Sequence, residues 1–202
     1  MEAQRNYYRT GATRSLAFRE LMLDSLYRKI REMEPEIHAA LQADLGKSAF
    51  ESYMCETGLT LSEISYMKTH LRNFAAKKRV RTPIAQFPSR SYVLKEPYGC
   101  VLIMSPWNYP FMLTLEPLAD AIAAGNTVIL KPSAYSPATS AVIKKLIAAV
   151  FPEEYVAVIE GGRAENQSLL EQKFDYIFFT GGTAVGKLVL QKAAEHFTPV
   201  TL

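Results

Sequence analysis

A glycine-rich turn is the segment of this sequence with the clearest capacity for chemistry. Residues 179–187 read Phe-Thr-Gly-Gly-Thr-Ala-Val-Gly-Lys and lead from an apolar stretch into a segment with helical periodicity. Glycines let backbone N–H groups approach a phosphate, and a helix N-terminus favours negative charge. These features make the turn a candidate phosphate site, formed by Gly181, Gly182, Thr183, Ala184, Val185 and Gly186.

Two common nucleotide-binding motifs resemble this turn, but the turn lacks a residue that each of them requires. The P-loop of NTPases requires Ser or Thr after its lysine to hold magnesium, and here Leu188 follows Lys187. The common dinucleotide fingerprint requires glycine where Thr183 stands, and it follows the first strand of its domain rather than the fourth. A magnesium-dependent NTPase is thus disfavoured. By itself the turn is compatible with a phosphate site or with a bend that merely needs glycine.

A second segment, residues 104–110, reads Met-Ser-Pro-Trp-Asn-Tyr-Pro. Two prolines stiffen the backbone around Asn108, whose amide NH2 could donate to a developing oxyanion. Such a contact contributes roughly 2.7–4 kcal/mol in a site without water. The alternative is that Asn108 caps a helix starting near Phe111, with Trp107 as an ordinary core residue.

The third segment, residues 130–134, reads Leu-Lys-Pro-Ser-Ala. Lys131 at the end of an apolar run could donate a charged hydrogen bond to ribose hydroxyls, worth on the order of 1.5–3 kcal/mol. The alternative is a lysine that is simply solvated at the end of a strand.

The elements that must position these residues alternate between short apolar runs and helical stretches. Short, nearly all-apolar strands of this kind predict a parallel α/β sheet with both faces covered. Ligands of such sheets bind beyond the carboxyl ends of the strands, where all three segments lie. We expect strands at 100–104, 127–130, 156–159 and 176–179, a further strand opening at 199–202, and helices at 137–151 and 183–197.

The first third of the chain has the apolar spacing of helices. One stripe starts at Leu16 with Thr13 as its N-cap, and Pro35 fits the first turn of a second helix that Gly46 ends. A third stripe runs from Met54 to Phe74 and closes in the basic residues 77–79, where positive charge suits a helix C-terminus.

The helical spacing of apolar residues stops at residues 81–98. Three prolines there exclude a continuous helix, and residues 91–94 favour a short strand. The segment is apolar and aromatic enough that we do not expect it to be solvated along its length. The chain thus divides into a helical region (1–80), an extended connector (81–98), and an incomplete Rossmann-like nucleotide-binding region (99–202) on which the helical region packs.

Composition narrows the class of protein. The chain of 202 residues is 49% apolar and 21% charged with a net charge of +3, and no basic stripe indicates nucleic-acid binding. The first residues are polar, unlike a signal peptide, and no apolar run could span a bilayer. Cys55 and Cys100 have neither disulfide nor metal-ligand spacing, so a reduced, cytoplasmic compartment is expected.

Taken together, the three segments resemble the aldehyde dehydrogenase superfamily, in particular its class 3-like, fatty-aldehyde branch. The family's Pro-Trp-Asn-aromatic-Pro motif stands at 106–110, its Lys-Pro-Ser motif at 131–133, and its phosphate turn at 179–186. Residues 44–47, 82–88 and 96–99 extend the resemblance over nearly the whole chain.

The resemblance implies a reaction and roles for residues. In this family a cysteine thiolate attacks an aldehyde, hydride passes to NAD or NADP, and a glutamate assists hydrolysis to the acid. By resemblance Asn108 is the oxyanion donor, and Lys131 and Ser133 bind the cofactor together with the glycine-rich turn. Tyr109 and Leu113, one helical turn apart, would line the aldehyde tunnel.

Two departures from the family pattern stand out. Glutamate usually follows Lys-Pro-Ser and repels a 2′-phosphate, whereas Ala134 stands here, so better tolerance of NADP is expected. The sequence also stops before the family's glutamate and cysteine, which predicts an N-terminal fragment that is inactive alone. Cys55 and Cys100 are expected to be inert core thiols rather than substitutes for the nucleophile.

The resemblance also implies partners. Relatives form homodimers in which the region near Ser91–Lys95 pairs with a later part of the chain, so the full-length enzyme is expected to be a homodimer. A rival hypothesis is a non-catalytic nucleotide-binding remnant. The complete motif around Asn108 argues against it, because a pure nucleotide binder has no oxyanion to stabilise.

Overall fold

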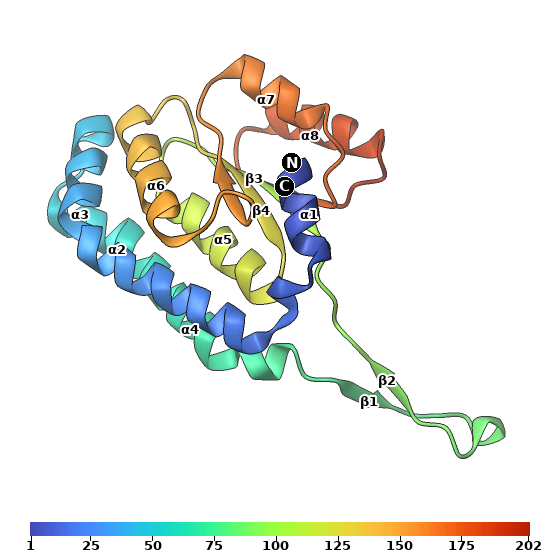
Figure 1. Ribbon diagram of the computed structural model, residues 1–202. Coiled ribbons are helices and arrows are strands. Elements are labelled where there is room, and N and C mark those ends of the chain that lie inside the picture. The colour runs from blue at the N-terminus through green and yellow to red at the C-terminus, as the bar shows by residue number, and fades with distance from the viewer.

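A five-stranded parallel sheet forms the centre of the structure. The computed structural model describes residues 1–202 (Figure 1). The strand order is β5-β4-β3-β6-β7, so the chain first winds outward in one direction from β3 and then returns to the other side of it. The strands are β3 (Cys100–Met104), β4 (Thr127–Lys131), β5 (Val156–Val158), β6 (Tyr176–Phe179) and β7 (Val200–Thr201).

The register of the central strands brings the predicted site segments to one edge. Met104 lies opposite Lys131 on one side of β3 and opposite Phe179 on the other. All residues of β3 and β4 are buried, as the continuous apolar runs predict for a sheet covered on both faces. The predicted parallel α/β fold is confirmed.

Helices cover the sheet and extend away from it on one side (Figure 1). The long helix α2 packs beside α4, α5 and α6, and α8 lies with α7 on the opposite face. None of the helices combines the length and apolar composition that a bilayer crossing requires. The helices are α1 (Glu2–Arg9), α2 (Leu16–Leu45), α3 (Ala49–Ser52), α4 (Gly58–Phe74), α5 (Met112–Ala124), α6 (Pro137–Val150), α7 (Arg163–Leu170) and α8 (Thr183–Ala194).

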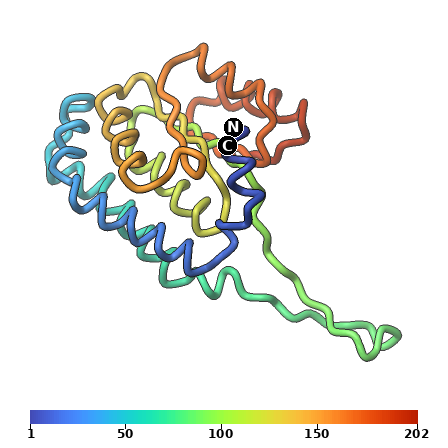
Figure 2. The backbone as a smooth tube through the Cα atoms, in the orientation of Figure 1, coloured from blue at the N-terminus to red at the C-terminus, as the bar shows by residue number.

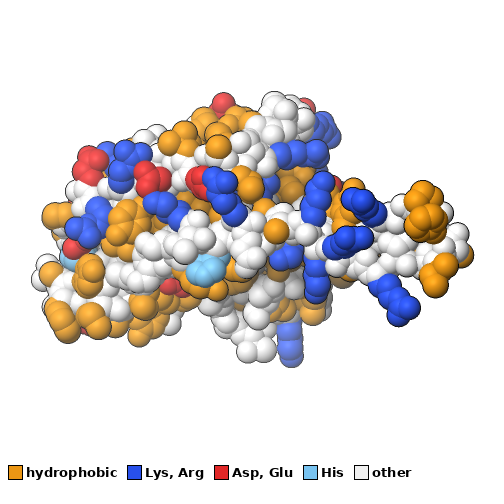
Figure 3. Space-filling model, turned by 90° about the horizontal axis from the view of Figure 1, so that it is seen from below, with side chains coloured by type: hydrophobic (Ala, Val, Ile, Leu, Met, Phe, Trp, Pro, Cys, Tyr) orange, Lys and Arg blue, Asp and Glu red, His pale blue; other side chains and the backbone are white.

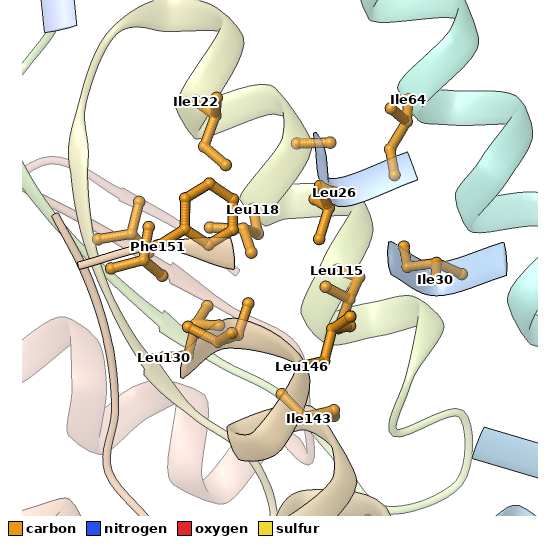
Figure 4. Close-up of a cluster of buried hydrophobic side chains, with 14 of the residues drawn as sticks. Leu26, Ile30, Ile64, Leu115, Leu118, Ile122, Leu130, Ile143, Leu146 and Phe151 are labelled. Carbon is orange, nitrogen blue, oxygen red and sulfur yellow. The ribbon is translucent and has the colours of Figure 1, made fainter. Parts of the chain in front are cut away.

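Alternate residues of each strand face two separate apolar cores. On β3, Val101 and Ile103 join the larger core, while Leu102 and Met104 face the smaller one. The larger core contains side chains from α2, α4, α5 and α6, some of which Figure 4 shows meeting above β4. The smaller core contains Leu170 of α7 and Val189 of α8. The N-terminal helices are therefore part of the packing that covers one face of the sheet.

The first helical stripes merge into one element, which corrects the prediction at Pro35. Helix α2 runs unbroken through Pro35 and ends at Gly46, whose φ of 69° is left-handed. Ile37 and Leu41, beyond the proline, are fully buried in the same core as Ile30. Burying two such side chains stabilises by about 3–6 kcal/mol, which offsets the roughly 3 kcal/mol cost of an interior proline.

Two other predicted helix ends are also wrong. Ser15, not Thr13, caps α2, because its Oγ accepts from the Phe18 backbone N–H; Thr13 is buried in the preceding 3-10 turn. The predicted third helix is divided, with a π-helical segment over Tyr53–Thr57 before α4. Helix α4 ends at Phe74, and two of the three basic residues after it, Lys78 and Arg79, belong to a strand.

That strand belongs to a hairpin that projects from the body of the molecule (Figures 1 and 2). Strands β1 (Lys78–Val80) and β2 (Ser91–Val93) pair antiparallel, and a 3-10 turn at Ile84–Gln86 lies at the tip. Ile84 is 88% exposed and Phe87 86%, so the expectation that this connector is not solvated is wrong for the single chain. Apolar side chains gather at the tip, and Lys and Arg lie along the hairpin (Figure 3).

A buried guanidinium ties the start of α2 to the end of α5. Arg19 is 7% exposed, and its side chain donates to the carbonyl oxygens of Thr13, Arg14 and Ala123 at 2.7, 3.2 and 3.1 Å. Carbonyls at a helix C-terminus lack partners within the helix and favour positive charge. Burial lowers the pKa of Arg19 from its usual value, although the group stays protonated.

We expect Arg19→Met to lower the free energy of unfolding by about 3–5 kcal/mol, because it leaves buried carbonyl groups without a donor. Chemical denaturation followed by circular dichroism measures this. Arg14→Met, at an exposed position of the same segment, is the matched control and should change stability by less than about 0.5 kcal/mol. Equal effects of the two substitutions would contradict the role given to Arg19.

Candidate functional site

A cavity of about 720 Å³ opens at the carboxyl ends of the central strands. This is the edge at which β3 and β6, the two strands where the chain reverses its winding direction, lie side by side. Such a switch point is where open α/β sheets bind ligands, and the volume is that of a small-molecule site. The lining residues include Met104, Lys131, Ser133, Ala134, Gly161, Arg163, Phe179, Val185 and Lys192.

Lys131 is held in the wall of this cavity rather than solvated. Its side chain is buried, and Nζ donates to the carbonyl oxygens of Pro132 at 2.8 Å and Gly161 at 2.7 Å. Burial lowers the pKa of Lys131, and the nearby carboxylate of Glu165 opposes the shift. The ammonium group therefore lies at a fixed point between the loops after β4 and β5.

The loop after β4 is shaped by hydrogen bonds around Ser133. The Ser133 Oγ accepts from the Tyr135 N–H at 3.2 Å, and its carbonyl oxygen accepts from the hydroxyl of Ser140 at 2.9 Å. Asp44, at the end of α2, accepts from the N–H groups of Ala138 and Thr139 in the first turn of α6. The predicted cofactor loop is thus fixed at both ends, with Ser133 facing the cavity.

The glycine-rich turn forms the uncapped N-terminus of α8. Gly182 is the N-cap and no side chain accepts from the first-turn N–H groups, so these donors are free for an anion. Gly181 is required sterically, because a Cβ there would lie 2.5 Å from the Phe179 ring. Val185 lines the cavity, whereas Thr183 and Ala184 are exposed and do not belong to its lining.

The loop that carries Asn108 lies outside the lining of this cavity. Asn108 is exposed, and its backbone carbonyl accepts from Lys47 Nζ at 2.9 Å. Asn108 does not cap α5, whose N-cap is Phe111 without a side-chain cap. Trp107 is 53% exposed and is not a core residue of this chain. The structure therefore removes the structural alternative for this motif and leaves the Asn108 amide free.

The carboxylate that caps α5 comes from Glu56, which sequence reasoning missed. Glu56 is fully buried, and its Oε2 accepts from the backbone N–H groups of Phe111 at 2.9 Å and Met112 at 3.0 Å. Its Oε1 lies 2.5 Å from Lys47 Nζ. No spacing rule connects Glu56 with a helix that begins more than fifty residues later, so only the tertiary structure reveals the contact.

Of the two predicted tunnel residues, Tyr109 lies in this loop and Leu113 in the first turn of α5. The Leu113 N–H donates to the Tyr109 carbonyl at 3.0 Å, which confirms their separation of one helical turn. Tyr109 is 39% exposed, and Lys47 Nζ lies 4.1 Å from the centre of its ring. A cation–π contact therefore holds the ring in place while part of the side chain stays exposed.

The structure thus brings together some predicted residues and separates others. Lys131, Ser133 and Val185 share the cavity, and Arg163 and Lys192 add two positive charges that no sequence pattern indicated. Asn108 and Tyr109 form a second group on the adjoining loop. A cationic cavity beside a free helix N-terminus suits a phosphate-containing ligand.

The comparisons with known proteins agree with this arrangement. The sequence model of the aldehyde dehydrogenase family matches residues 1–202. The chain belongs to the aldehyde dehydrogenase family. It is 48% identical to the 4,4′-diaponeurosporen-aldehyde dehydrogenase of Staphylococcus aureus over 97% of the chain, and 43% identical to mouse aldehyde dehydrogenase family 3 member A2 over 98%. The chain spans 43% and 41% of the length of these two relatives.

Solved structures extend the similarity to the fold. A substrate-bound Staphylococcus aureus AldH superposes with a TM-score of 0.97 and 47% identity, over all of this chain and 44% of that one. A Mycobacterium tuberculosis aldehyde dehydrogenase complexed with NAD+ gives a TM-score of 0.89 at 27% identity, over all of this chain and 42% of that one.

The two thiols of the aldehyde dehydrogenase chain are differently placed. Cys100 is 1% exposed at the start of β3, and burial raises its pKa to about 11. Cys55 is partly exposed within the π-helical segment. Cys100 is consequently protonated at neutral pH, as expected for an inert core thiol, whereas Cys55 is less buried than expected.

We expect Cys100 to resist alkylation in the folded chain. With a pKa of about 11, only about one thiol in a thousand is ionised at pH 8, and burial blocks access further. Iodoacetamide labelling followed by peptide mass spectrometry should modify Cys55 first and Cys100 only after denaturation. Labelling of Cys100 as fast as Cys55 without denaturant would contradict the burial of this thiol.

Proposed function

We propose that the complete protein, in which this chain supplies the cofactor-binding part, oxidises an aldehyde to a carboxylic acid with NAD or NADP. The observation that carries the proposal is the cationic cavity at the switch point, with the Asn108 loop beside it, in a member of this family. The aldehyde dehydrogenase of Mycobacterium tuberculosis with the same fold was solved with NAD+, which supports the choice of cofactor.

The residues present fit a dinucleotide. The free N–H groups of α8 suit a pyrophosphate, and Lys131 and Ser133 are polar groups of the wall that could meet ribose hydroxyls. A bound cofactor would accept hydride from the substrate. The contribution of this chain is to hold that cofactor in the cavity and to keep its position fixed relative to the adjoining loop.

Asn108 is the group of this chain proposed to act on the aldehyde. Its amide NH2 would donate to the carbonyl oxygen of the substrate and stabilise negative charge that develops there. Tyr109 and Leu113 would form an apolar wall beside it. The neutral amide suits this role, because a charged donor would compete for water and for the phosphates of the cofactor.

We expect Asn108→Ala in the complete protein to lower kcat by about 10²–10³-fold, because one oxyanion donor is lost. Cofactor affinity should stay unchanged, since Asn108 does not line the cavity. Steady-state formation of reduced cofactor measures turnover, and fluorescence titration measures affinity. Asn73→Ala, at an exposed position of α4, is the matched control.

The same assay separates the proposal from its rival. A wild-type protein that binds NAD or NADP but turns over no aldehyde would contradict oxidation and favour a non-catalytic nucleotide-binding protein. Full activity of Asn108→Ala would instead remove Asn108 from the mechanism while leaving oxidation in place.

Ala134 is proposed to widen cofactor choice. It lines the cavity where the family usually carries glutamate, and Arg163 lines the same cavity. We expect Ala134→Glu to weaken NADP binding at least about tenfold relative to NAD, or about 1.4 kcal/mol, because a carboxylate repels the 2′-phosphate. Isothermal titration with both cofactors measures the ratio, and Ala134→Gln controls for size. Much tighter binding of NAD than of NADP to the wild type would contradict the idea.

The same proposal includes a homodimer in a cytoplasmic location. The projecting β1–β2 hairpin exposes Ile84 and Phe87 at its tip, as well as Tyr92 and Val93 along β2. Exposed apolar side chains of this kind mark interaction surfaces, and a second copy of the protein is the proposed partner. The reduced thiols Cys55 and Cys100 suit a reducing compartment.

A further inference from the structure

The ion pair between Lys47 and Glu56 is the most deeply buried one in the chain. The two side chains are 9% and 0% exposed, and Lys47 Nζ lies 2.5 Å from Glu56 Oε1. In the other eight ion pairs both side chains are at least 26% exposed. A buried ion pair is costly to form and contributes little to stability compared with apolar packing. Stability alone therefore does not account for this pair, and a role in the site is the alternative.

The remaining contacts of both partners converge on one loop. Lys47 Nζ donates to the Asn108 carbonyl oxygen at 2.9 Å and lies over the Tyr109 ring. Glu56 accepts from the N–H groups of Phe111 and Met112, at the start of α5. The pair therefore holds the backbone of residues 108–112 at both ends of the loop, at Asn108 and at Phe111 and Met112.

No side chain within residues 108–112 makes the hydrogen bonds that Lys47 and Glu56 make to this loop. The first turn of α5 has no side-chain cap of its own, and the Asn108 side chain is exposed without a hydrogen bond. The region that the Asn108 amide can reach is consequently set by the position of its backbone. The carboxylate of Glu56 satisfies the donors of α5, and Lys47 both balances that charge and fixes the Asn108 carbonyl.

We propose that Lys47 and Glu56 are positioning residues that hold the backbone of Asn108 where its amide can reach the aldehyde oxygen. The inference rests on the proposed function, because it assigns the pair a task in that reaction. Displacing a reacting group by about 1 Å can cost about 10²-fold in rate, so a rigid support for this loop has a direct consequence for turnover.

Lys47→Met in the complete protein tests the inference. It removes the donor to Asn108 while keeping an unbranched side chain of similar length. We expect kcat to fall about 10–100-fold, while KM for NAD changes less than about twofold, since the pair lies outside the cofactor cavity. Arg72→Gln, which breaks an exposed ion pair with Glu20 between α4 and α2, is the matched control and should leave both constants unchanged.

A double-mutant cycle shows whether Lys47 acts through Asn108. If it does, Lys47→Met should reduce kcat strongly in the wild type and less than about twofold in the Asn108→Ala background. Equal reductions in both backgrounds would overturn the inference and leave Lys47 with a general structural role. An unchanged kcat for Lys47→Met alone, in a protein where Asn108→Ala is impaired, would overturn it as well.

A measurement without turnover separates this inference from the proposed function. Glu56→Gln keeps an acceptor for α5 but loses the charge, and it serves as a second variant if Lys47→Met does not fold. Hydrogen exchange of a peptide covering residues 105–115 should become at least about tenfold faster in either variant, with unchanged exchange in a peptide covering α8. If the wild type oxidises no aldehyde, the proposed function fails. Unchanged exchange at 105–115 would overturn the positioning role by itself.

Discussion

The buried charge of Glu56 is the constraint on which the arrangement of the site depends. A carboxylate without exposure to water must be compensated, and here Lys47 and two backbone N–H groups of α5 compensate it. Asp44, three residues before Lys47, accepts from the first turn of α6 in the same manner. The end of α2 fixes the start of α6, and the π-helical segment after α2 fixes the start of α5, so the N-terminal helical region is part of the site's construction.

The parallel sheet supplies the second half of this construction. Its register places Met104 opposite both Lys131 and Phe179, so the loops after three strands open onto one cavity. The loops carry different kinds of hydrogen-bond donor. Cationic side chains and free N–H groups surround the cavity, and the neutral amide of Asn108 lies outside it. Under the proposed function, this separation would allow a negatively charged cofactor and an uncharged carbonyl group to bind side by side without competing for the same donors.

Packing overrode local sequence signals where the two conflicted. Proline predicts a helix start, yet α2 continues through Pro35 because Ile37 and Leu41 gain more from burial than the helix loses at the proline. The hairpin shows the opposite case. Its apolar residues predict burial, and Ile84 and Phe87 are nonetheless exposed because nothing in this chain reaches the tip. The two results depend on the presence of distant contacts in one case and on their absence in the other, and neither can be read from periodicity or local propensity.

The sequence by itself determined the strands of the parallel sheet, the order of the motifs and the residue types at the ends of those strands. These follow from local composition, because buried parallel strands must be continuously apolar and turns that approach phosphates need glycine. Only the tertiary structure decided that Lys131 is buried against two carbonyl groups, that Arg163 and Lys192 join its cavity, and that Glu56 caps α5. Those contacts join residues far apart in the chain, and they form only when the helices have packed against the sheet.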